Sequence, residues 1–155
     1  MTAMEIYTSC VRTDQTADSN SFGRIVLSFQ RRQKTRQRVD TQSGRAITIN
    51  LPRGTVMRGG DRLVSEAGSI VHVVAACERV STVASHDAQA LARAAYHLGN
   101  RHVSVQIGLG WVRYLQDHVL DIMLRELGLE PKEERAPFEP DTGAYNSHSH
   151  SHASA

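Results

Sequence analysis

Apolar and polar positions alternate over short stretches in the first part of the chain. Residues 25–29 and 47–51 carry a large apolar side chain at every second position. A period of two is typical of β-strands with one buried face. Turn-forming residues separate such stretches at Ser43-Gly44, Pro52-Arg53-Gly54, Gly59-Gly60-Asp61 and Ala67-Gly68. The pattern predicts a compact β domain over residues 1–68.

Four further strands are predicted in the second part of the chain. A long valine-rich stretch covers residues 70–83, and shorter stretches cover residues 103–107, 111–115 and 130–135. Gly108-Leu109-Gly110 lies between the second and third of these strands and predicts a hairpin turn.

Two helices are predicted between these strands. The first begins after Ser85, which we expect to be its N-cap, and ends at Gly99. The second is capped by Asp117 and ends at Gly128. Strands and helices then follow the order β-α-β-β-α-β of a ferredoxin-like domain, which we assign to residues 69–138.

The last part of the chain differs in composition from both predicted domains. Proline, glycine, serine and histidine dominate from Ala136 onward, and such a segment is expected to be disordered. The predicted fold class is therefore α+β, with a small N-terminal β domain, a ferredoxin-like domain and a flexible histidine-containing tail over residues 139–155.

Ile122 lies on the outer face of the second predicted helix. With Leu120 at the centre of the buried face, a spacing of 100° per residue turns Ile122 almost directly away from it. An apolar side chain in this position indicates contact with a second subunit. The alternative is an isolated apolar residue on the surface, which is common in soluble proteins.

Composition and cysteine usage are those of a soluble intracellular protein. No apolar run approaches the roughly 20 residues that cross a bilayer, so no membrane association is expected. The first ten residues lack the features of a secretory signal. Cys10 and Cys77 are far apart in sequence and are expected to be reduced thiols in the cytoplasm.

Charge is distributed unevenly along the chain. Residues 23–62 contain ten Lys or Arg against two acidic residues, and residues 117–141 contain eight acidic residues against three basic ones. The basic stretch at residues 31–38 would suit RNA or an acidic protein surface. A solvated strand edge, where positive charge discourages aggregation, explains the same residues.

His148, His150 and His152 alternate with serines near the C-terminus. Imidazole nitrogen is a good ligand for nickel, copper, zinc and cobalt, so a short histidine tract predicts metal binding. A flexible segment loses entropy when it binds, which favours modest affinity and rapid exchange. A purification tag is the alternative, but such tags are usually unbroken histidine runs.

His97, His102 and His118 form a second, looser group of histidines. None of them has the i, i+4 helical spacing of a zincin-type site, and no His-Glu-x-x-His motif occurs. Their spacing alone favours surface or interface histidines.

The order of several motifs resembles that of the UreE family of urease accessory nickel chaperones, over nearly the whole chain. These motifs are Leu51-Pro52-Arg53-Gly54, Gly60-Asp61-Arg62-Leu63, His97-Leu98-Gly99-Asn100-Arg101-His102, Gln106-Ile107, Arg113-Tyr114, Asp117-His118-Val119-Leu120, Ala136-Pro137-Phe138-Glu139-Pro140 and Gly143-Ala144-Tyr145.

This resemblance implies Ni(II) as cargo and specific positions as ligands. The family's interfacial nickel ligand falls on His102, and a second metal-contacting histidine falls on His118. Gln116 stands where some members carry a further histidine, which puts a secondary site in doubt. His97 is a possible auxiliary ligand, and the tail histidines correspond loosely to those that complete the site in some members.

The resemblance also implies partners. Family members form homodimers, hand nickel to an accessory GTPase and act on the apo-urease complex, and the N-terminal domain is of a partner- or peptide-binding type. Because Cu(II) and Zn(II) also bind imidazole, the sequence does not rank nickel above them.

Catalysis and RNA binding are two other classes of function that the sequence could serve. No paired carboxylates, nucleophile and base, or phosphate-binding loop indicate catalysis, so no catalytic residue is assigned. An RNA-binding module shares the β-α-β-β-α-β order, but residues 103–108 contain no aromatic side chain on which a base would stack, so nucleic acid is not expected. General metal storage by the tail is the remaining alternative.

Overall fold

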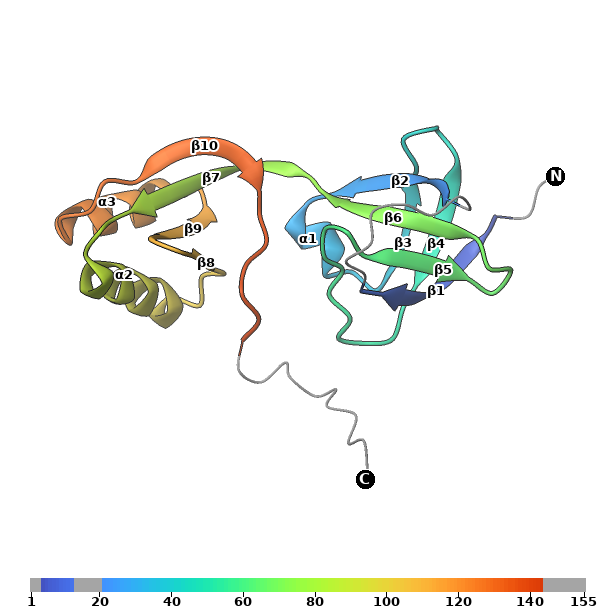
Figure 1. The fold of residues 1–155 in the computed structure, drawn as a ribbon, viewed down its shortest axis with the longest axis horizontal. Coiled ribbons are helices and arrows are strands. Elements are labelled where there is room, and N and C mark those ends of the chain that lie inside the picture. The colour runs from blue at the N-terminus through green and yellow to red at the C-terminus, as the bar shows by residue number, and fades with distance from the viewer. Residues whose placement is uncertain (1–3, 13–20, 144–155) are drawn as a thin grey trace, which may run out of the picture. The chain divides into compact units, whose positions relative to one another are not determined.

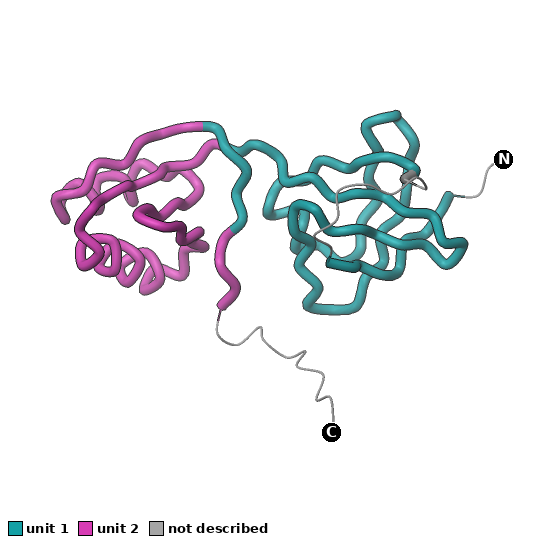
Figure 2. Tube along the Cα trace, in the orientation of Figure 1, with its two compact units in different colours: residues 1–78, 135–139 teal, residues 79–134, 140–155 magenta. Residues whose placement is uncertain are grey.

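The computed structural model describes residues 4–12 and 21–143, shown in Figure 1. The chain divides into two compact units, coloured separately in Figure 2. The N-terminal unit holds the residues up to Glu78 together with Arg135–Glu139. The C-terminal unit holds Arg79–Glu134 and the residues from Pro140 onward. The molecule is of mixed α+β class, with two sheets and few helices, as the sequence predicts.

The N-terminal unit is built on a six-stranded sheet with the strand order β2-β6-β5-β1-β4-β3. Its elements are β1 (Ile6–Val11), β2 (Ser21–Leu27), α1 (Phe29–Arg32), β3 (Arg36–Asp40), β4 (Ala46–Asn50), β5 (Arg62–Ser65) and β6 (Ile70–Ala75).

Alternating residues of these strands form the core of the N-terminal unit. Ile47 and Ile49 of β4 are fully buried, and so are Tyr7 of β1, Leu63 of β5 and Val71 of β6. The period of two in the sequence therefore identified the buried face of β4 correctly.

The basic stretch at residues 31–38 has two structural roles rather than one. Arg36 and Arg38 are exposed on β3, which lies at an edge of the sheet, so the interpretation as a solvated strand edge holds there. It is wrong for Arg32, whose side chain is completely buried at the end of α1.

The C-terminal unit is built on a four-stranded sheet with the order β10-β7-β9-β8. Its elements are β7 (Cys77–Ala84), α2 (Ala88–Asn100), β8 (Gln106–Gly108), β9 (Trp111–Leu115), α3 (His118–Glu126) and β10 (Lys132–Pro137). Strand β9 pairs antiparallel with both β7 and β8, and the hairpin turn predicted between β8 and β9 is confirmed. Leu98 of α2 and Leu124 of α3 are fully buried with Val83 and Tyr114 from the sheet.

The prediction of one long strand over residues 70–83 is wrong. The stretch is interrupted at Ala76, so that β6 pairs in the first sheet and β7 in the second. Local apolar character is the same on both sides of this interruption, and only the pairing partners differ.

The ends of α2 also differ from the prediction. Asp87, not Ser85, is the N-cap, because its carboxylate accepts hydrogen bonds from the backbone N–H groups of Gln89 and Ala90. The Ser85 hydroxyl instead accepts a hydrogen bond from the N–H of Asp87. Gly99 lies inside the helix, which continues to Asn100. The Asp117 N-cap of α3 is confirmed.

Two strand boundaries differ as well. Strand β8 begins at Gln106 and not at Val103. The Val103 N–H instead donates to the Leu98 carbonyl at 3.2 Å, a hydrogen bond that belongs to the end of α2. Strand β10 begins and ends two residues later than predicted. The prediction of disorder from Ala136 onward is therefore wrong for residues 136–138, because β10 includes Pro137 and Phe138 is fully buried. None of the helices in the described residues combines the length and the apolar character that a bilayer crossing requires.

Candidate functional site

His102 lies two residues beyond the end of helix α2, in a left-handed backbone conformation. Its φ of 56° is the only positive value at a non-glycine residue among residues 4–12 and 21–143. The His102 N–H donates to the Gly99 carbonyl at 2.9 Å, which satisfies one of the free carbonyls at the helix end. The left-handed conformation costs a non-glycine residue roughly 1–2 kcal/mol, so an observed outlier of this kind is a reason to look for a function. The side chain is exposed.

His97 lies five residues earlier on the same helix. It is half-buried, and its ring meets the ring of Tyr96 edge to face at 5.4 Å between centroids. Tyr96 itself is 65% exposed. An aromatic side chain this exposed on a helix adds to the surface that a partner would cover.

His118 is the first residue of α3 and is exposed. The preceding Asp117 uses its Oδ1 atom to accept from the N–H groups of Val119 at 2.8 Å and Leu120 at 3.1 Å. That oxygen therefore caps the N-terminus of α3, and the side chain of His118 is exposed to solvent.

Among residues 4–12 and 21–143, no three His, Cys, Asp or Glu side chains are arranged to hold a metal ion. His97, His102 and His118 of one chain thus form no such group. His148, His150 and His152 lie outside the described residues.

Exposed apolar side chains gather on the same unit. Leu109 at the β8–β9 turn is fully exposed, and Ile107, Val119 and Ile122 are 57%, 69% and 42% exposed. The outward position that the sequence predicts for Ile122 is confirmed. Ile122 is therefore not an isolated exposed apolar residue, because three other large apolar side chains of the same unit are exposed as well.

The two thiols differ in environment and are not paired with each other. Cys10 is partly buried, and burial together with the neighbouring Asp61 carboxylate raises its pKa to about 12. Since thiolates and not thiols bind metals, Cys10 is a poor ligand at neutral pH. Cys77 is exposed at the start of β7.

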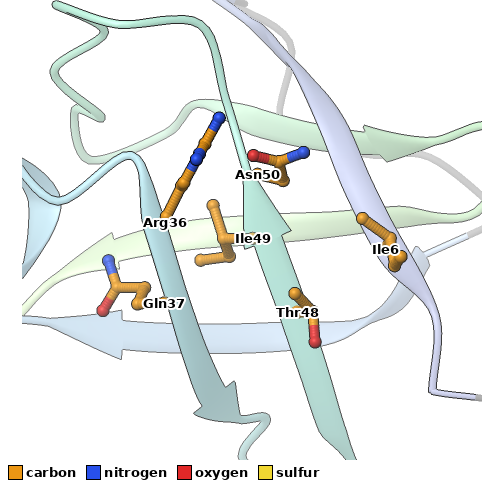
Figure 3. Close-up of a pocket in the computed structure, with 6 residues that line it drawn as sticks. All are labelled: Ile6, Arg36, Gln37, Thr48, Ile49 and Asn50. Atoms are coloured by element: carbon orange, nitrogen blue, oxygen red, sulfur yellow. The ribbon is translucent and has the colours of Figure 1, made fainter.

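An open hollow of about 400 Å³ lies along strands β1, β3 and β4 of the N-terminal unit. Figure 3 shows Arg36 on β3, Thr48 and Asn50 on β4, and Ile6 on β1 around it. Ile6 is half exposed, so the hollow combines an apolar side chain with a positive charge.

Comparisons with known proteins match both units of the chain to the same family. A model of the UreE urease accessory protein N-terminal domain matches residues 8–76, and a model of its C-terminal domain matches residues 78–155. The chain is 55% identical over 121 residues to a urease accessory protein UreE of Alkalilimnicola ehrlichii, covering 78% of this chain and 74% of that protein. It is 55% identical over 130 residues to the UreE of a Pseudomonas putida strain, covering 83% and 81%. For the UreE of Nostoc punctiforme the values are 44% over 129 residues, with 83% and 87% covered.

Proposed function

The chain belongs to the UreE family of urease accessory proteins, and we propose on this basis that it binds Ni(II) and donates it during assembly of the urease active site. Membership of the family implies a role in urease maturation. Nickel is then cargo that is bound and released, and no residue acts as a catalyst.

The observation that carries the proposal is the placement of His102. Its exposed imidazole is held just beyond the end of a packed helix, whose closing turn fixes the left-handed backbone of His102. One imidazole supplies one nitrogen, which is too few for a tight metal site. In a two-fold dimer, a residue near the axis meets its own copy, so two His102 rings would face one ion.

The remaining ligands would come from the tail and from neighbouring histidines. His148, His150 and His152 would add imidazoles to the pair of His102 rings, with His118 and His97 as auxiliary ligands. Because these ligands are imidazoles, Cu(II) and Zn(II) are expected to compete with Ni(II), so selectivity would come from supply and partners.

We further propose that the C-terminal unit is a ferredoxin-like domain that dimerises. The strand order β10-β7-β9-β8 and the two helices between the strands support this fold. The exposed side chains of Ile107, Leu109 and Ile122 support burial against a second copy. The accessory GTPase and the apo-urease complex are the proposed recipients in the cytoplasm, a location supported by the two free thiols.

Nickel titration calorimetry combined with analytical ultracentrifugation tests this function. The tightest site is expected to hold one Ni(II) per two chains, and nickel should strengthen the dimer because it joins only the associated form. His102→Ala should abolish this site and leave the weaker sites of the tail. His118→Ala serves as the matched control and should have a smaller effect. A tight site of one metal per chain that survives His102→Ala would contradict the proposal.

A further inference from the structure

Gly99 is a glycine that the fold of a single chain does not require. The sequence predicts that it ends α2, but it lies inside the helix, which continues to Asn100, and its φ is not in the positive range that favours glycine. A Cβ added at this position would have no atom within 4 Å outside its own stretch of helix. Glycine is less favourable than alanine within a helix, because it loses more backbone freedom on folding. The chain therefore carries a destabilising residue where alanine would fit.

The other glycines do not share this combination of features. At Gly59 and Gly108, an added Cβ would crowd a neighbouring side chain. Gly143 also faces open space, but it lies in no helix or strand. The remaining ones have a positive φ, namely Gly23, Gly44, Gly54, Gly60, Gly68, Gly110 and Gly128. In the part of the chain that the structure describes, Gly99 is thus the one helical glycine that neither the backbone nor a neighbour requires.

Gly99 lies beside the proposed nickel ligand. The N–H of His102 donates to the Gly99 carbonyl at 2.9 Å, so both residues belong to the turn that closes α2. Both are exposed, and Tyr96, about one turn before Gly99, is 65% exposed. The exposed side of this helix end therefore presents an aromatic ring, a position without a side chain and an imidazole.

We propose that Gly99 is a positioning residue, whose missing side chain lets a second copy of the chain approach closely enough for two His102 rings to bind one ion. This rests on the proposed function, in which the ion is shared across a two-fold axis. Imidazole nitrogens lie about 2.0–2.1 Å from a bound zinc ion, so two rings on one ion have nitrogens within about 4 Å of each other. A residue in the same turn as His102 is then held close to the second copy. Side-chain atoms at Gly99 would occupy space that this copy needs.

Substitution of Gly99 should separate the stability of a single chain from its association. Gly99→Ala favours the helix and meets no atom beyond it, so we expect the dilute, metal-free single chain to melt about 2–8 °C higher. The same methyl group should weaken both dimerisation and the shared nickel site, since overpacking a close contact typically costs a factor of about five to a hundred. Gly99→Leu adds more atoms and should weaken both further.

Nickel titration of the full chain and analytical ultracentrifugation of the metal-free chain measure the two effects on association. Gln89→Leu is the matched control, because it also places a leucine at an exposed position of α2. Gln89 lies ten residues before Gly99, or about 15 Å along the helix. This control should leave dimerisation and nickel affinity within about twofold of the unsubstituted chain. A role of Gly99 in folding alone would not raise the melting temperature while weakening association.

Two results would overturn the inference. One is dimerisation and nickel affinity within about twofold of the unsubstituted chain for both Gly99→Ala and Gly99→Leu. The other is a lower melting temperature of the single Gly99→Ala chain, since Gly99 would then be required by the fold itself. An unsubstituted chain without a tight site that depends on His102 would instead refute the proposed function. Weaker dimerisation of Gly99→Leu in such a chain would still place Gly99 in the contact between two copies.

Discussion

Asp121 shows how a buried polar side chain stabilises the start of α3. Its side chain is only 7% exposed, and it accepts from the Tyr114 hydroxyl at 2.5 Å and from the Gln116 amide at 3.2 Å. Burial alone would raise the pKa of Asp121, but the hydrogen bonds from Tyr114 and Gln116 and the nearby Ser81 hydroxyl outweigh it and lower the pKa. The first turn of a helix also favours a negative charge.

Asp121→Asn is expected to lower the free energy of unfolding by about 1–3 kcal/mol at neutral pH. The asparagine NH2 group is a donor, and it would replace a carboxylate oxygen that accepts from the Gln116 amide. A lowered folded-state pKa contributes stability that is complete above the unfolded value of about 3.9 and is lost as pH falls through the lower folded value. The difference between the two proteins should therefore stay constant above about pH 5 and shrink in more acidic solution. Urea unfolding at several pH values measures it, and a difference that grows in acid would contradict this account.

The two thiols should react at very different rates with an alkylating reagent. Cys77 is exposed, whereas Cys10 is partly buried, donates to Asp61 at 3.5 Å and has a pKa of about 12. Thiolate is the reactive form, so Cys10 should be unreactive near pH 8 in the folded protein. Mass spectrometry after iodoacetamide treatment should locate the first label on Cys77. Equal labelling in urea provides the control, and early labelling of Cys10 without urea would count against the structure.

At the scale of elements, the single turn of α1 holds part of the C-terminal chain in the N-terminal unit. Arg32 is fully buried and donates to the carbonyls of Leu27, Met57 and Phe138 and to the Glu139 carboxylate. Phe138 is also fully buried and meets the ring of Phe29 edge to face at 5.6 Å. The guanidinium thus donates to three carbonyls and one carboxylate, and hydrogen bonding and charge pairing of this kind are the condition for burying a charge.

Arg32→Leu should destabilise the N-terminal unit by about 3–5 kcal/mol, because it leaves the carbonyls of Leu27, Met57 and Phe138 without the guanidinium that donates to them. The Glu139 carboxylate would keep only its weaker contacts with Gly59 and Arg58. Arg31→Leu is the matched control. Arg31 is exposed and binds Gln37 and the Arg38 carbonyl, so its loss should cost about 1 kcal/mol or less. Urea unfolding followed through NMR signals of the N-terminal unit measures both, and equal costs would contradict the role of Arg32.

At the scale of the whole molecule, the last anchored part of the described chain is Asp141. Phe138 and Glu139 are bound in one unit and Asp141 in the other, while Asp141, Thr142 and Gly143 are exposed. Residues up to Asp141 therefore contribute to folded structure, and we expect those after Tyr145 to contribute little to stability.

A chain that ends after Tyr145 should melt at the same temperature as the full chain when both are free of metal. It should bind fewer nickel ions, because it lacks His148, His150 and His152. A chain that ends after Pro137 provides the contrast: it also lacks Phe138, Glu139 and Asp141, so its N-terminal unit should melt at a markedly lower temperature. Calorimetric melting tests both, and a loss of several degrees in the longer chain would contradict the prediction.

Sequence alone determined the features that depend on neighbouring residues. The period of two predicted the buried face of β4, Asp117 was identified as the cap of α3, and the glycines around Leu109 predicted the β8–β9 turn. Local hydrogen bonds and side-chain periodicity act over a few residues, so the sequence carries them directly. The order of motifs in the sequence was enough to identify the family. The proposal that His102 is a nickel ligand rests on the same resemblance.

Tertiary structure alone decided the features that depend on distant partners. The apolar run at residues 70–83 is divided because β6 and β7 pair in different sheets, and pairing is not encoded in apolar character. Arg32 resembles its exposed neighbours in sequence. It is buried because its guanidinium forms an ion pair with the carboxylate of Glu139, over a hundred residues away. Asp141 is bound because folding brings the Val105 carbonyl and the Ile107 N–H beside it. In each case the stabilising partner is remote in the chain, and only folding brings the two together.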